Sequence, residues 1–315
     1  VIAGAFQAFR LLGELNAAVV FSKGGFVAVP VVLAARMRRI PVVIHESDGD
    51  PGLATRITAR WADRICVAYA DMVEMFPRRL RARVVVTGNP VRSAFFGAGH
   101  PPATSATATS GPSTATGDGA AHGVLPALGL TETTDPVVLI TGGSFGARQL
   151  NEWVAAIVVK LTPEAVVIHQ TGEHGAHMIP ELTGRATPGR YYGAATFTDL
   201  FPAILRRTDL VVARAGAGTI WEIAVTGRPA LLVPLSTAAS RGDQIRNAER
   251  YRAAGAADVL DQPDADAELF LQRIRQLVRD PDRRTALGVG ALRWAGPNGA
   301  KQLASIIATH VSTVV

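Results

Sequence analysis

A glycine turn between a strand and a helix, at residues 210–222, carries the clearest chemistry in this sequence. The segment LVVARAGAGTIWE joins a short apolar run, typical of a central strand in a parallel sheet, to a helix start through Gly216 and Gly218. Such a turn directs backbone N–H groups and a helix dipole at one point, which favours a phosphate. Glu222 lies one turn into the helix, where its carboxylate could accept hydrogen bonds from sugar hydroxyls. The alternative interpretation is a tight turn followed by a surface glutamate.

A second turn of this kind, TGGSFGAR at residues 141–148, is typical of a phosphate cradle. Gly142, Gly143 and Gly146 would let backbone N–H groups approach an anion, and Ser144 would add a hydroxyl donor. The spacing matches neither GxGxxG with a downstream acid nor GxxxxGK[ST]. A dinucleotide-dependent dehydrogenase and a P-loop enzyme are therefore disfavoured, whereas a plain tight turn stays the alternative.

Three further turns follow predicted strands: SKGGFVAVP at 22–30, the acidic HESDGDPG at 45–52, and TGNPVR at 87–92. Arg92 at the end of the last one could pair with a pyrophosphate through two hydrogen bonds, although on its own a surface arginine is the better interpretation. The carboxyl ends of parallel strands lie at one edge of a sheet, so these turns predict ligand-binding edges.

The elements that would hold these turns alternate between strands and helices, which predicts doubly wound parallel sheets of the α/β class. Strands are predicted at 17–21, 41–45, 64–68, 83–87, 136–141, 165–169, around 191, 210–213, 230–233 and 257–260. Helices are predicted at the amino terminus and at 26–38, 50–62 (with a loop), 267–278 and 301–313.

The 315 residues suit two domains. We expect a first Rossmann-like domain over 1–96 and a second over 136–315, whose last helix could return to the first domain. Residues 97–135 between them are rich in Ala, Thr, Ser, Gly and Pro, with few large apolar groups. Such a composition predicts a disordered linker.

Composition narrows the class of partner. The chain is 48% hydrophobic and 18% charged, with a formal net charge of +6. This balance permits anionic partners such as nucleotides, pyrophosphates or an acidic membrane surface. Aromatic residues make up only 6% and do not alternate with a basic stripe, so nucleic acid is not expected. The single cysteine, Cys66, excludes a disulfide framework and fits a reducing cytoplasm.

Several residues with suggestive chemistry are better explained by structure. His174 and His177 lack a third ligand nearby, so no metal site is expected. His45 and Glu46 are neighbours on a strand and point to opposite faces, which favours structural roles. The arginines at 78, 79, 81 and 83 and at 36, 38 and 39 could touch anionic lipid headgroups, but a solvated basic face is the default. The longest apolar run, 26–35, is too short to span a bilayer, which takes ~20 residues.

Taken in order, the segments SKGGFVAVP, HESD with PGLA, TGNPVR, GGSFGA, ARAGAGTIWE and SRGDQIRNA resemble the MurG family of peptidoglycan glycosyltransferases. The resemblance covers nearly the whole chain except residues 97–135. It implies an inverting enzyme with a GT-B fold, two Rossmann-like domains with the cleft between them. This enzyme would transfer GlcNAc from UDP-GlcNAc to undecaprenyl-diphospho-MurNAc-pentapeptide, so that lipid I becomes lipid II. The carboxyl-terminal half would bind UDP-GlcNAc and the amino-terminal half the lipid acceptor, at the cytoplasmic face of the cell membrane as a peripheral protein, without a cofactor.

The resemblance also implies roles for individual residues of the carboxyl-terminal half. Ala217, Gly218 and Thr219 would line the nucleotide, beside the turn at Gly216. Glu222 would hold the ribose hydroxyls, and Gln244, in the turn DQIRNA, would contact the GlcNAc hydroxyls.

The remaining implied contacts concern the diphosphate, the base and the sugar. Ser144 and Arg92 would contact the diphosphate region. Thr198 matches a position whose backbone reads the uracil, and Asp48 matches a position near the sugar.

The chain departs from the family pattern in three places. It carries His45-Glu46-Ser47-Asp48 where many members have HEQN, and Phe145 where many have Gln or Arg. We interpret both as subfamily variation. The family's GGTGGH-like loop is not found in the sequence, which starts at Val1. We therefore expect a fragment lacking at least one βαβ unit of ~30 residues, and the catalytic base is expected in that unit.

Two other function classes are compatible with the same turns. One is a different GT-B enzyme, such as a glycolipid glycosyltransferase or a UDP-GlcNAc 2-epimerase-like protein. The other is an inactive module that binds a nucleotide sugar without turning it over.

Overall fold

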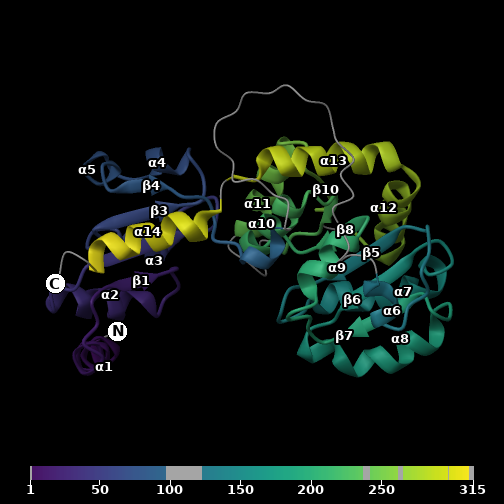
Figure 1. The fold of residues 1–315 in the computed structure, drawn as a ribbon, viewed down its shortest axis with the longest axis horizontal. Helices are drawn as coiled ribbons and strands as arrows, with labels where there is room; N and C mark the ends of the chain where they lie inside the picture. Colours follow the sequence, from purple (N-terminus) through teal and green to yellow (C-terminus); the bar gives the residue numbers. More distant parts are fainter. Residues whose placement is uncertain (1, 97–122, 237–241, 262–264, 297, 312–315) are drawn as a thin grey trace. The chain divides into compact units, whose positions relative to one another are not determined.

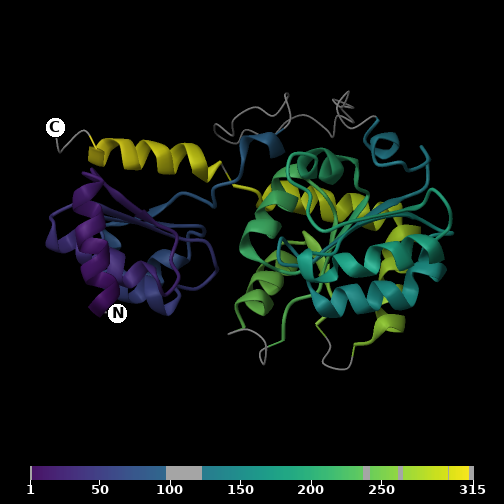
Figure 2. The ribbon, with the colours of Figure 1, turned by 90° about the horizontal axis from the view of Figure 1, so that it is seen from below.

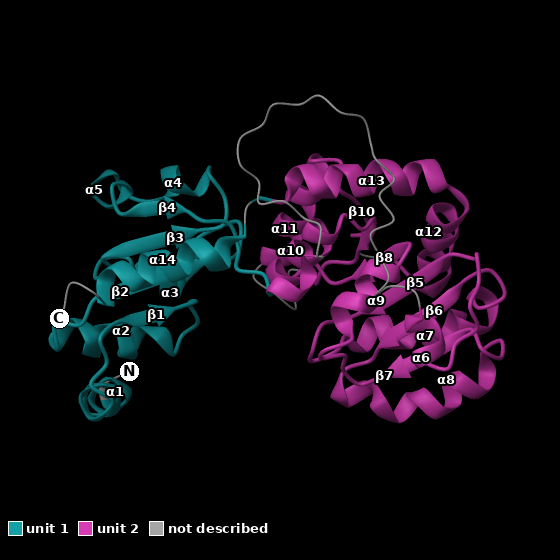
Figure 3. Ribbon diagram, viewed as in Figure 1, with its two compact units in different colours: residues 1–92, 296–315 teal, residues 93–295 magenta. Residues whose placement is uncertain are grey.

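The computed structural model describes residues 2–96, 123–236, 242–261, 265–296 and 298–311. It divides into two compact units (Figure 3). Unit 1 comprises residues 1–92 and 296–315, and unit 2 comprises residues 93–295. Each has its own parallel sheet, as the alternation of strands and helices predicts.

Unit 1 is built on a four-stranded parallel sheet of order β1-β2-β3-β4 (Figure 1). Its strands are β1 Val20–Ser22, β2 Val42–Glu46, β3 Arg64–Val67 and β4 Val84–Val86. Its helices are α1 Ile2–Glu14, α2 Ala28–Met37, α3 Leu53–Thr58, α4 Met72–Met75, α5 Arg78–Arg81 and α14 Gly299–Val311.

Alternate residues of this sheet face two different helical layers. Val42 and Ile44 belong to one apolar cluster together with residues of α1 and α2, such as Leu12 and Val32. Val43 and Cys66 point the other way and pack against Leu303 of α14. The final helix therefore covers a face of the unit 1 sheet, as Figures 1 and 2 show. Cys66 is fully buried, and burial raises the pKa of its thiol to about 11, so it packs as a small apolar residue.

Unit 2 holds a six-stranded parallel sheet of order β10-β9-β8-β5-β6-β7. Its strands are β5 Val137–Thr141, β6 Val166–Gln170, β7 Tyr191–Ala194, β8 Leu210–Ala213, β9 Ala230–Leu232 and β10 Ala257–Val259. Its α-helices are α6 Val124–Ala127, α7 Arg148–Leu161, α8 Ile179–Arg185, α9 Phe201–Arg207, α10 Ala217–Thr226, α11 Asp243–Ala253, α12 Ala267–Arg279 and α13 Pro281–Trp294. Two 3₁₀ segments, η1 Ser93–Phe95 and η2 Glu173–Met178, complete the described elements.

The central strands of unit 2 are buried on both faces. Val138 and Ile140 of β5 join a cluster with residues of α7 and α12. Leu139, which faces the opposite side of β5, is also fully buried, and so is Val211 of β8. Burial on both faces explains why these strands read as continuous apolar runs rather than as alternating ones.

The amino ends of the strands are tied together by aspartates in both units. Asp209, just before β8, accepts a hydrogen bond from the Val137 N–H at the start of β5 (2.8 Å), and its own N–H donates to the Val137 carbonyl. Asp63, just before β3, makes the same pair of bonds with Val42 of β2. The two sheets thus share the same hydrogen-bonded link at the amino ends of neighbouring strands.

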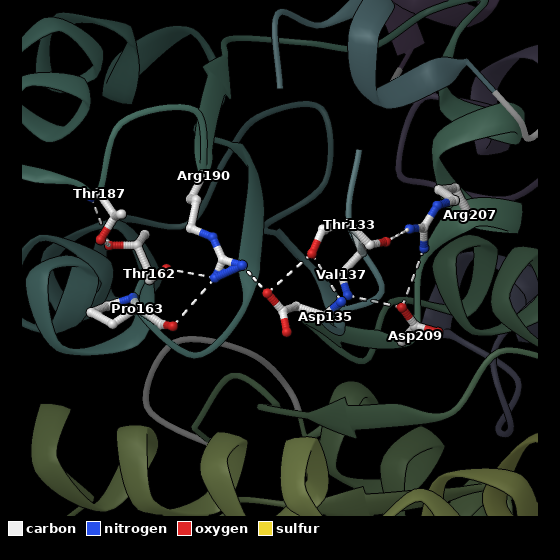
Figure 4. Close-up of polar contacts among 9 residues, drawn as sticks. All are labelled: Thr133, Asp135, Val137, Thr162, Pro163, Thr187, Arg190, Arg207 and Asp209. Carbon is white, nitrogen blue, oxygen red and sulfur yellow. Dashed lines mark hydrogen bonds and ion pairs between the residues drawn. The ribbon is translucent and has the colours of Figure 1, made fainter. Parts of the chain in front are cut away.

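In unit 2 this amino edge of the sheet carries a wider polar network, shown in Figure 4. Arg207 donates to the Thr133 carbonyl at 3.1 Å and to Asp209 at 3.4 Å. Arg190, just before β7, pairs with Asp135 and donates to the Pro163 carbonyl. These contacts fix the segment that enters β5.

The predicted strands are confirmed, with small shifts at their ends. The first begins at Val20 rather than 17, because α1 ends in a turn in which Asn16 has a φ of 48°. In that turn the Ala17 N–H bonds the Leu12 carbonyl, a helix-terminating arrangement. Helix α13 was not expected from the sequence.

Most of the predicted linker, 97–122, lies outside the described residues. Residues 123–135 belong to unit 2, where α6 buries Val124 and Leu125 next to α9. Among the described helices, none is both long enough and apolar enough to cross a bilayer.

Candidate functional site

The site in unit 2 lies where the order of strands in the sheet reverses. The chain runs from β5 outward through β6 to β7, then returns to β8 beside β5 and runs outward through β9 to β10. In open α/β sheets, ligands bind at the carboxyl ends of the strands at such a switch point. Both glycine turns predicted as phosphate-facing follow these two strands, at 142–147 after β5 and at 214–216 after β8.

The turn after β5 requires its glycines for its own backbone. Gly143 and Gly146 have φ values of +82° and +78°, a region that side chains rarely allow. A Cβ on Gly142 would overlap the Ala147 backbone nitrogen. The turn is closed by a hydrogen bond from the Gly146 N–H to the Gly143 carbonyl (3.0 Å), and the Gly143 N–H donates to Thr141 Oγ1 (3.0 Å).

A neighbouring turn after β6, at residues 171–172, packs closely against this loop. A Cβ on Gly146 would overlap the Thr171 carbonyl oxygen, and one on Gly172 would overlap the Gly146 backbone. The Gln170 side-chain amide donates to the Gly143 carbonyl at 3.1 Å. Gln170, Thr171 and Gly172 were not predicted as site residues, although the polar run that follows the apolar strand at 165–168 was the available signal.

Two helix N-termini open at this edge. Helix α7 begins after Ala147 and α10 after Gly216, and neither of these N-cap residues makes a side-chain capping bond. The first N–H groups of each helix therefore need partners from outside the helix. Together with the helix dipoles, they form an anion-binding arrangement. Ser144 lies exposed on the first of these turns.

The turn after β8 differs, because its glycines are not required by the fold. Gly216 has a φ of −69°, and a Cβ there would approach only Thr219 Oγ1, at 3.9 Å. A Cβ on Gly218 would meet no atom within 4 Å in the described structure. The backbone of this turn is therefore left open to a ligand. Ala217, Thr219 and Glu222 follow it on α10 and are half-buried.

The first residue of this turn, Arg214, is a buried arginine. Arg214 donates to the Val233 carbonyl (3.0 Å), the Pro234 carbonyl (3.3 Å) and Gln149 Oε1 (3.0 Å). These acceptors are neutral oxygens, and burial lowers the pKa of the guanidinium. A positive charge thus lies at the start of the turn without a carboxylate among these partners. Arg214 was not predicted as a site residue, although it lies within the motif ARAGAGTIWE.

Two predicted contacts of the sugar and base lie on other elements of unit 2. Gln244 lies in the first turn of helix α11, which corrects the prediction of a turn there. Its Oε1 accepts a hydrogen bond from the Leu235 N–H (3.1 Å), just beyond β9. Ser240 and Arg241 of the same motif lie outside the described residues. Thr198 is exposed in the connection between β7 and α9.

Asp48 and Arg92 belong to unit 1. Asp48 follows β2, and its N–H donates to Glu46 Oε1 (3.3 Å). The Glu46 carboxylate also accepts bonds from the Gly52 N–H (3.0 Å) and Thr55 Oγ1 (2.6 Å), so it holds the whole acidic turn. Arg92 is exposed.

His45 holds the neighbouring turn after β4. Its Nε2 lies 2.9 Å from the Gly88 carbonyl and its Nδ1 lies 3.3 Å from Ser47 Oγ, which donates to Asn89 Oδ1. Burial lowers the pKa of His45 to about 4, so the ring is neutral. The structural roles predicted for His45 and Glu46 are confirmed by these bonds. Within the described residues, no group of three or more His, Cys, Asp or Glu side chains is placed to hold a metal ion.

Two family models match the chain. The glycosyltransferase family 28 N-terminal domain matches residues 1–67, and the glycosyltransferase family 28 C-terminal domain matches residues 137–290. The matches include the turns at 22–30, 45–52, 141–148 and 213–222.

Curated relatives agree with the family models. The UDP-N-acetylglucosamine–N-acetylmuramyl-(pentapeptide) pyrophosphoryl-undecaprenol N-acetylglucosamine transferase of Treponema denticola is 38% identical, over 88% of this chain and 67% of its own length. The protein of the same name from Lachnospira eligens is 38% identical, over 89% of this chain and 71% of its own length.

Solved structures show the same fold. The crystal structure of Acinetobacter baumannii MurG has a TM-score of 0.68 at 27% identity and covers 97% of this chain and 78% of its own. A UDP complex of Staphylococcus aureus MnaA has a TM-score of 0.69 at 12% identity, over 99% of this chain and 81% of its own, which shows the fold alone. On the strength of its relatives and of the two family models, the chain belongs to the MurG family within glycosyltransferase family 28, with the GT-B fold.

Proposed function

We propose that this chain is an N-acetylglucosaminyltransferase of peptidoglycan synthesis. It transfers GlcNAc from UDP-GlcNAc to undecaprenyl-diphospho-MurNAc-pentapeptide, with inversion at the anomeric carbon. The names of its relatives describe the donor, the acceptor and the transfer of N-acetylglucosamine. The structural observation that carries the proposal is the pair of helix starts, α7 and α10, whose N-cap residues make no side-chain capping bond, at the β5–β8 switch point of the described sheet.

The donor would occupy this edge of unit 2. The diphosphate would accept hydrogen bonds from N–H groups at 144–148 other than that of Gly146, which is bonded within the loop, with Ser144 Oγ as a further donor. The open backbone at 216–219 would lie along the nucleotide. Glu222, half-buried one turn into α10, would accept hydrogen bonds from the ribose hydroxyls.

The outer parts of the donor would meet the neighbouring turns. Gln244 already fixes its Oε1 on the Leu235 N–H, which would orient its amide group toward the GlcNAc hydroxyls. The backbone at Thr198 would read the uracil. Of the residues of unit 1, Arg92 would contact the diphosphate, and Asp48 would lie near the sugar.

The chemistry is a single displacement. The acceptor hydroxyl attacks the anomeric carbon, the bond from that carbon to the phosphate oxygen breaks, and a general base takes the hydroxyl proton. UDP leaves with an additional negative charge. The helix N-termini and the buried Arg214 of the turn after β8 stabilise that charge in the transition state.

The acceptor carries an undecaprenyl chain, so the enzyme must work at a membrane surface. We place it as a peripheral protein on the cytoplasmic face, where UDP-GlcNAc is available. The arginines of α5 and its flanks, at 78, 79, 81 and 83, supply positive charge that an anionic leaflet would attract.

The proposal is tested by incubating the purified product of the complete gene with UDP-[¹⁴C]GlcNAc and a lipid I analogue in detergent. We expect label in a product carrying GlcNAc and MurNAc, and loss of that product with Glu222→Ala. UDP-ManNAc formation without acceptor would instead identify an epimerase. Binding of UDP by calorimetry without any transfer would identify an inactive nucleotide-sugar module, and either result would overturn the proposal.

A further inference from the structure

Behind the 142–147 turn of unit 2 lies a buried chain of polar side chains that the proposed reaction does not use. Its members come from three elements: Tyr191 at the start of β7, His169 in β6 and Asn151 in α7. Tyr191 Oη lies 3.1 Å from His169 Nδ1, and His169 Nε2 lies 3.0 Å from Asn151 Oδ1. Asn151 Nδ2 donates to the Thr171 carbonyl at 2.9 Å. His169 is fully buried, and Asn151 and Tyr191 are nearly so.

The acceptor at one end of this network fixes the orientation of the groups next to it. The Thr171 carbonyl can only accept, so the Asn151 amide must present its Nδ2 there and its Oδ1 to the histidine. His169 Nε2 must then carry the proton that it donates to Oδ1. Burial favours the neutral ring, in which Nδ1 accepts a hydrogen bond from the Tyr191 hydroxyl.

The same carbonyl oxygen is the atom against which Gly146 packs. A Cβ on Gly146 would overlap Thr171 O, so the loop after β5 and the turn after β6 touch at this point. Asn151 lies four residues after Ala147, one turn into the helix that the loop starts, and its backbone N–H donates to the Ala147 carbonyl. A Cβ on Gly175 would overlap Asn151 Nδ2, so the amide is confined from the other side.

We propose that His169 and Asn151 are positioning residues that set the spacing between the 142–147 loop and the 171–172 turn, and thereby hold the loop's N–H groups in register for the donor diphosphate. This inference rests on the proposed function, since it assigns the loop to the diphosphate of UDP-GlcNAc. Burial lowers the pKa of His169 to about 4, which keeps the ring in its neutral form during turnover near neutral pH.

The test uses substitutions that keep the shape of the chain. Asn151→Asp retains the acceptor for His169 but puts a carboxylate oxygen against the Thr171 carbonyl. His169→Phe keeps the ring volume and removes both bonds. The matched control is Thr162→Val, which removes a buried hydroxyl bonded to the Val158 carbonyl at the far end of the same helix.

Each variant is measured for thermal stability, for UDP affinity by calorimetry and for the KM values of both substrates. We expect Asn151→Asp and His169→Phe to weaken UDP binding and raise the UDP-GlcNAc KM at least tenfold, while the acceptor KM changes less than twofold. Thr162→Val should lower the melting temperature and leave UDP affinity unchanged. The losses of UDP affinity caused by His169→Phe and by Asn151→Ala should not add up in the double variant, because both substitutions break the same hydrogen-bonded network.

Two outcomes would overturn the inference. If Asn151→Asp and His169→Phe lose stability as Thr162→Val does but bind UDP normally, the hydrogen-bonded side chains have only a structural role. If the acceptor KM rises as much as that of the donor, the chain does not act through the diphosphate loop. A wild-type protein that binds no UDP would overturn the proposed function itself, which separates the two failures.

Discussion

At the scale of single residues, glycine occurs in the two proposed donor turns for different physical reasons. Gly146 has a positive φ and no room for a Cβ, whereas Gly218 lies in open space within the described structure. A sequence pattern cannot tell these cases apart, because both positions read as glycine after an apolar strand. On the proposed function, glycines such as Gly146 build the site, and glycines such as Gly218 leave room for the ligand.

This difference predicts opposite outcomes for two alanine substitutions. Gly146→Ala should destabilise unit 2 by about 2 kcal/mol or more, because it adds backbone strain and an overlap with the Thr171 carbonyl. Gly218→Ala should leave the unfolding free energy unchanged and weaken UDP binding, since the added methyl group would stand where the nucleotide approaches. Denaturant titration and calorimetry on both variants check this. Normal UDP binding by Gly218→Ala would place the nucleotide elsewhere.

Glu222 gives a second prediction at this scale. A charged acceptor bonded to ribose hydroxyls contributes about 1.5–3 kcal/mol, so Glu222→Ala should weaken UDP binding at least tenfold. The same substitution should hardly change the affinity for 2′,3′-dideoxy-UDP, which lacks those hydroxyls. Calorimetry with both nucleotides is the measurement. An equal loss for both nucleotides would show that Glu222 supports the turn rather than the ribose.

At the scale of elements, the two edges of a sheet have different roles: one edge is proposed to bind ligand, and the other stabilises the fold. The carboxyl edge of the unit 2 sheet carries turns open to ligand, while the amino edge carries aspartates that tie neighbouring strands (Figure 4). Unit 1 repeats the amino-edge device through Asp63 and Val42. Binding and folding can therefore be perturbed independently in this fold.

The amino-edge aspartate predicts a purely structural variant. Asp209→Ala should leave the Val137 N–H without its side-chain acceptor and destabilise unit 2 by about 1–3 kcal/mol. The UDP affinity of the folded protein should stay unchanged, because the site lies at the opposite ends of the strands. Thermal unfolding measures the loss of stability, and calorimetry measures the UDP affinity. A weakened UDP affinity at a temperature where the variant is folded would contradict the prediction.

Strands were predictable from the sequence, whereas one long helix was not. The apolar runs of β5, β6 and β8 are clear because both faces of the sheet are buried. Helix α13 contains Gly288 and Gly290, which lower helix propensity and obscure the pattern. The structure uses both for close packing: a Cβ on Gly290 would overlap the Gly255 carbonyl, and one on Gly288 would come within 2.7 Å of the Gly227 carbonyl.

Those parts of the candidate site that lie within one continuous motif were predictable from the sequence. The turns after β5 and β8 each combine strand, glycines and helix start in consecutive residues, so their placement followed from the sequence. Gln170, Thr171 and Asn151 act on the loop through tertiary contacts from other segments. Such contacts leave no local pattern, and only the register of β5 with β6 brings them together.

At the scale of the whole molecule, each unit has, among its described residues, a fully buried histidine on a central strand whose neutral form is favoured by burial. His45 in β2 donates from Nε2 to the Gly88 carbonyl, and His169 in β6 donates to Asn151. Burial lowers the pKa of each ring from 6.5 to about 4. Both units should therefore respond to acid in the same pH window.

The sign of that response follows from proton linkage. The folded protein binds fewer protons at these rings than the unfolded chain does, so their contribution is complete above about pH 6.5 and is lost as the pH falls toward 4. Each histidine should cost about 2 kcal/mol of unfolding free energy at pH 5 relative to pH 7. Denaturant unfolding at the two pH values measures this, and His169→Phe should remove its share of the difference in unit 2 while leaving that of unit 1. If the variant and the wild type lost equal stability in both units, groups other than His169 would control the acid sensitivity of the donor half.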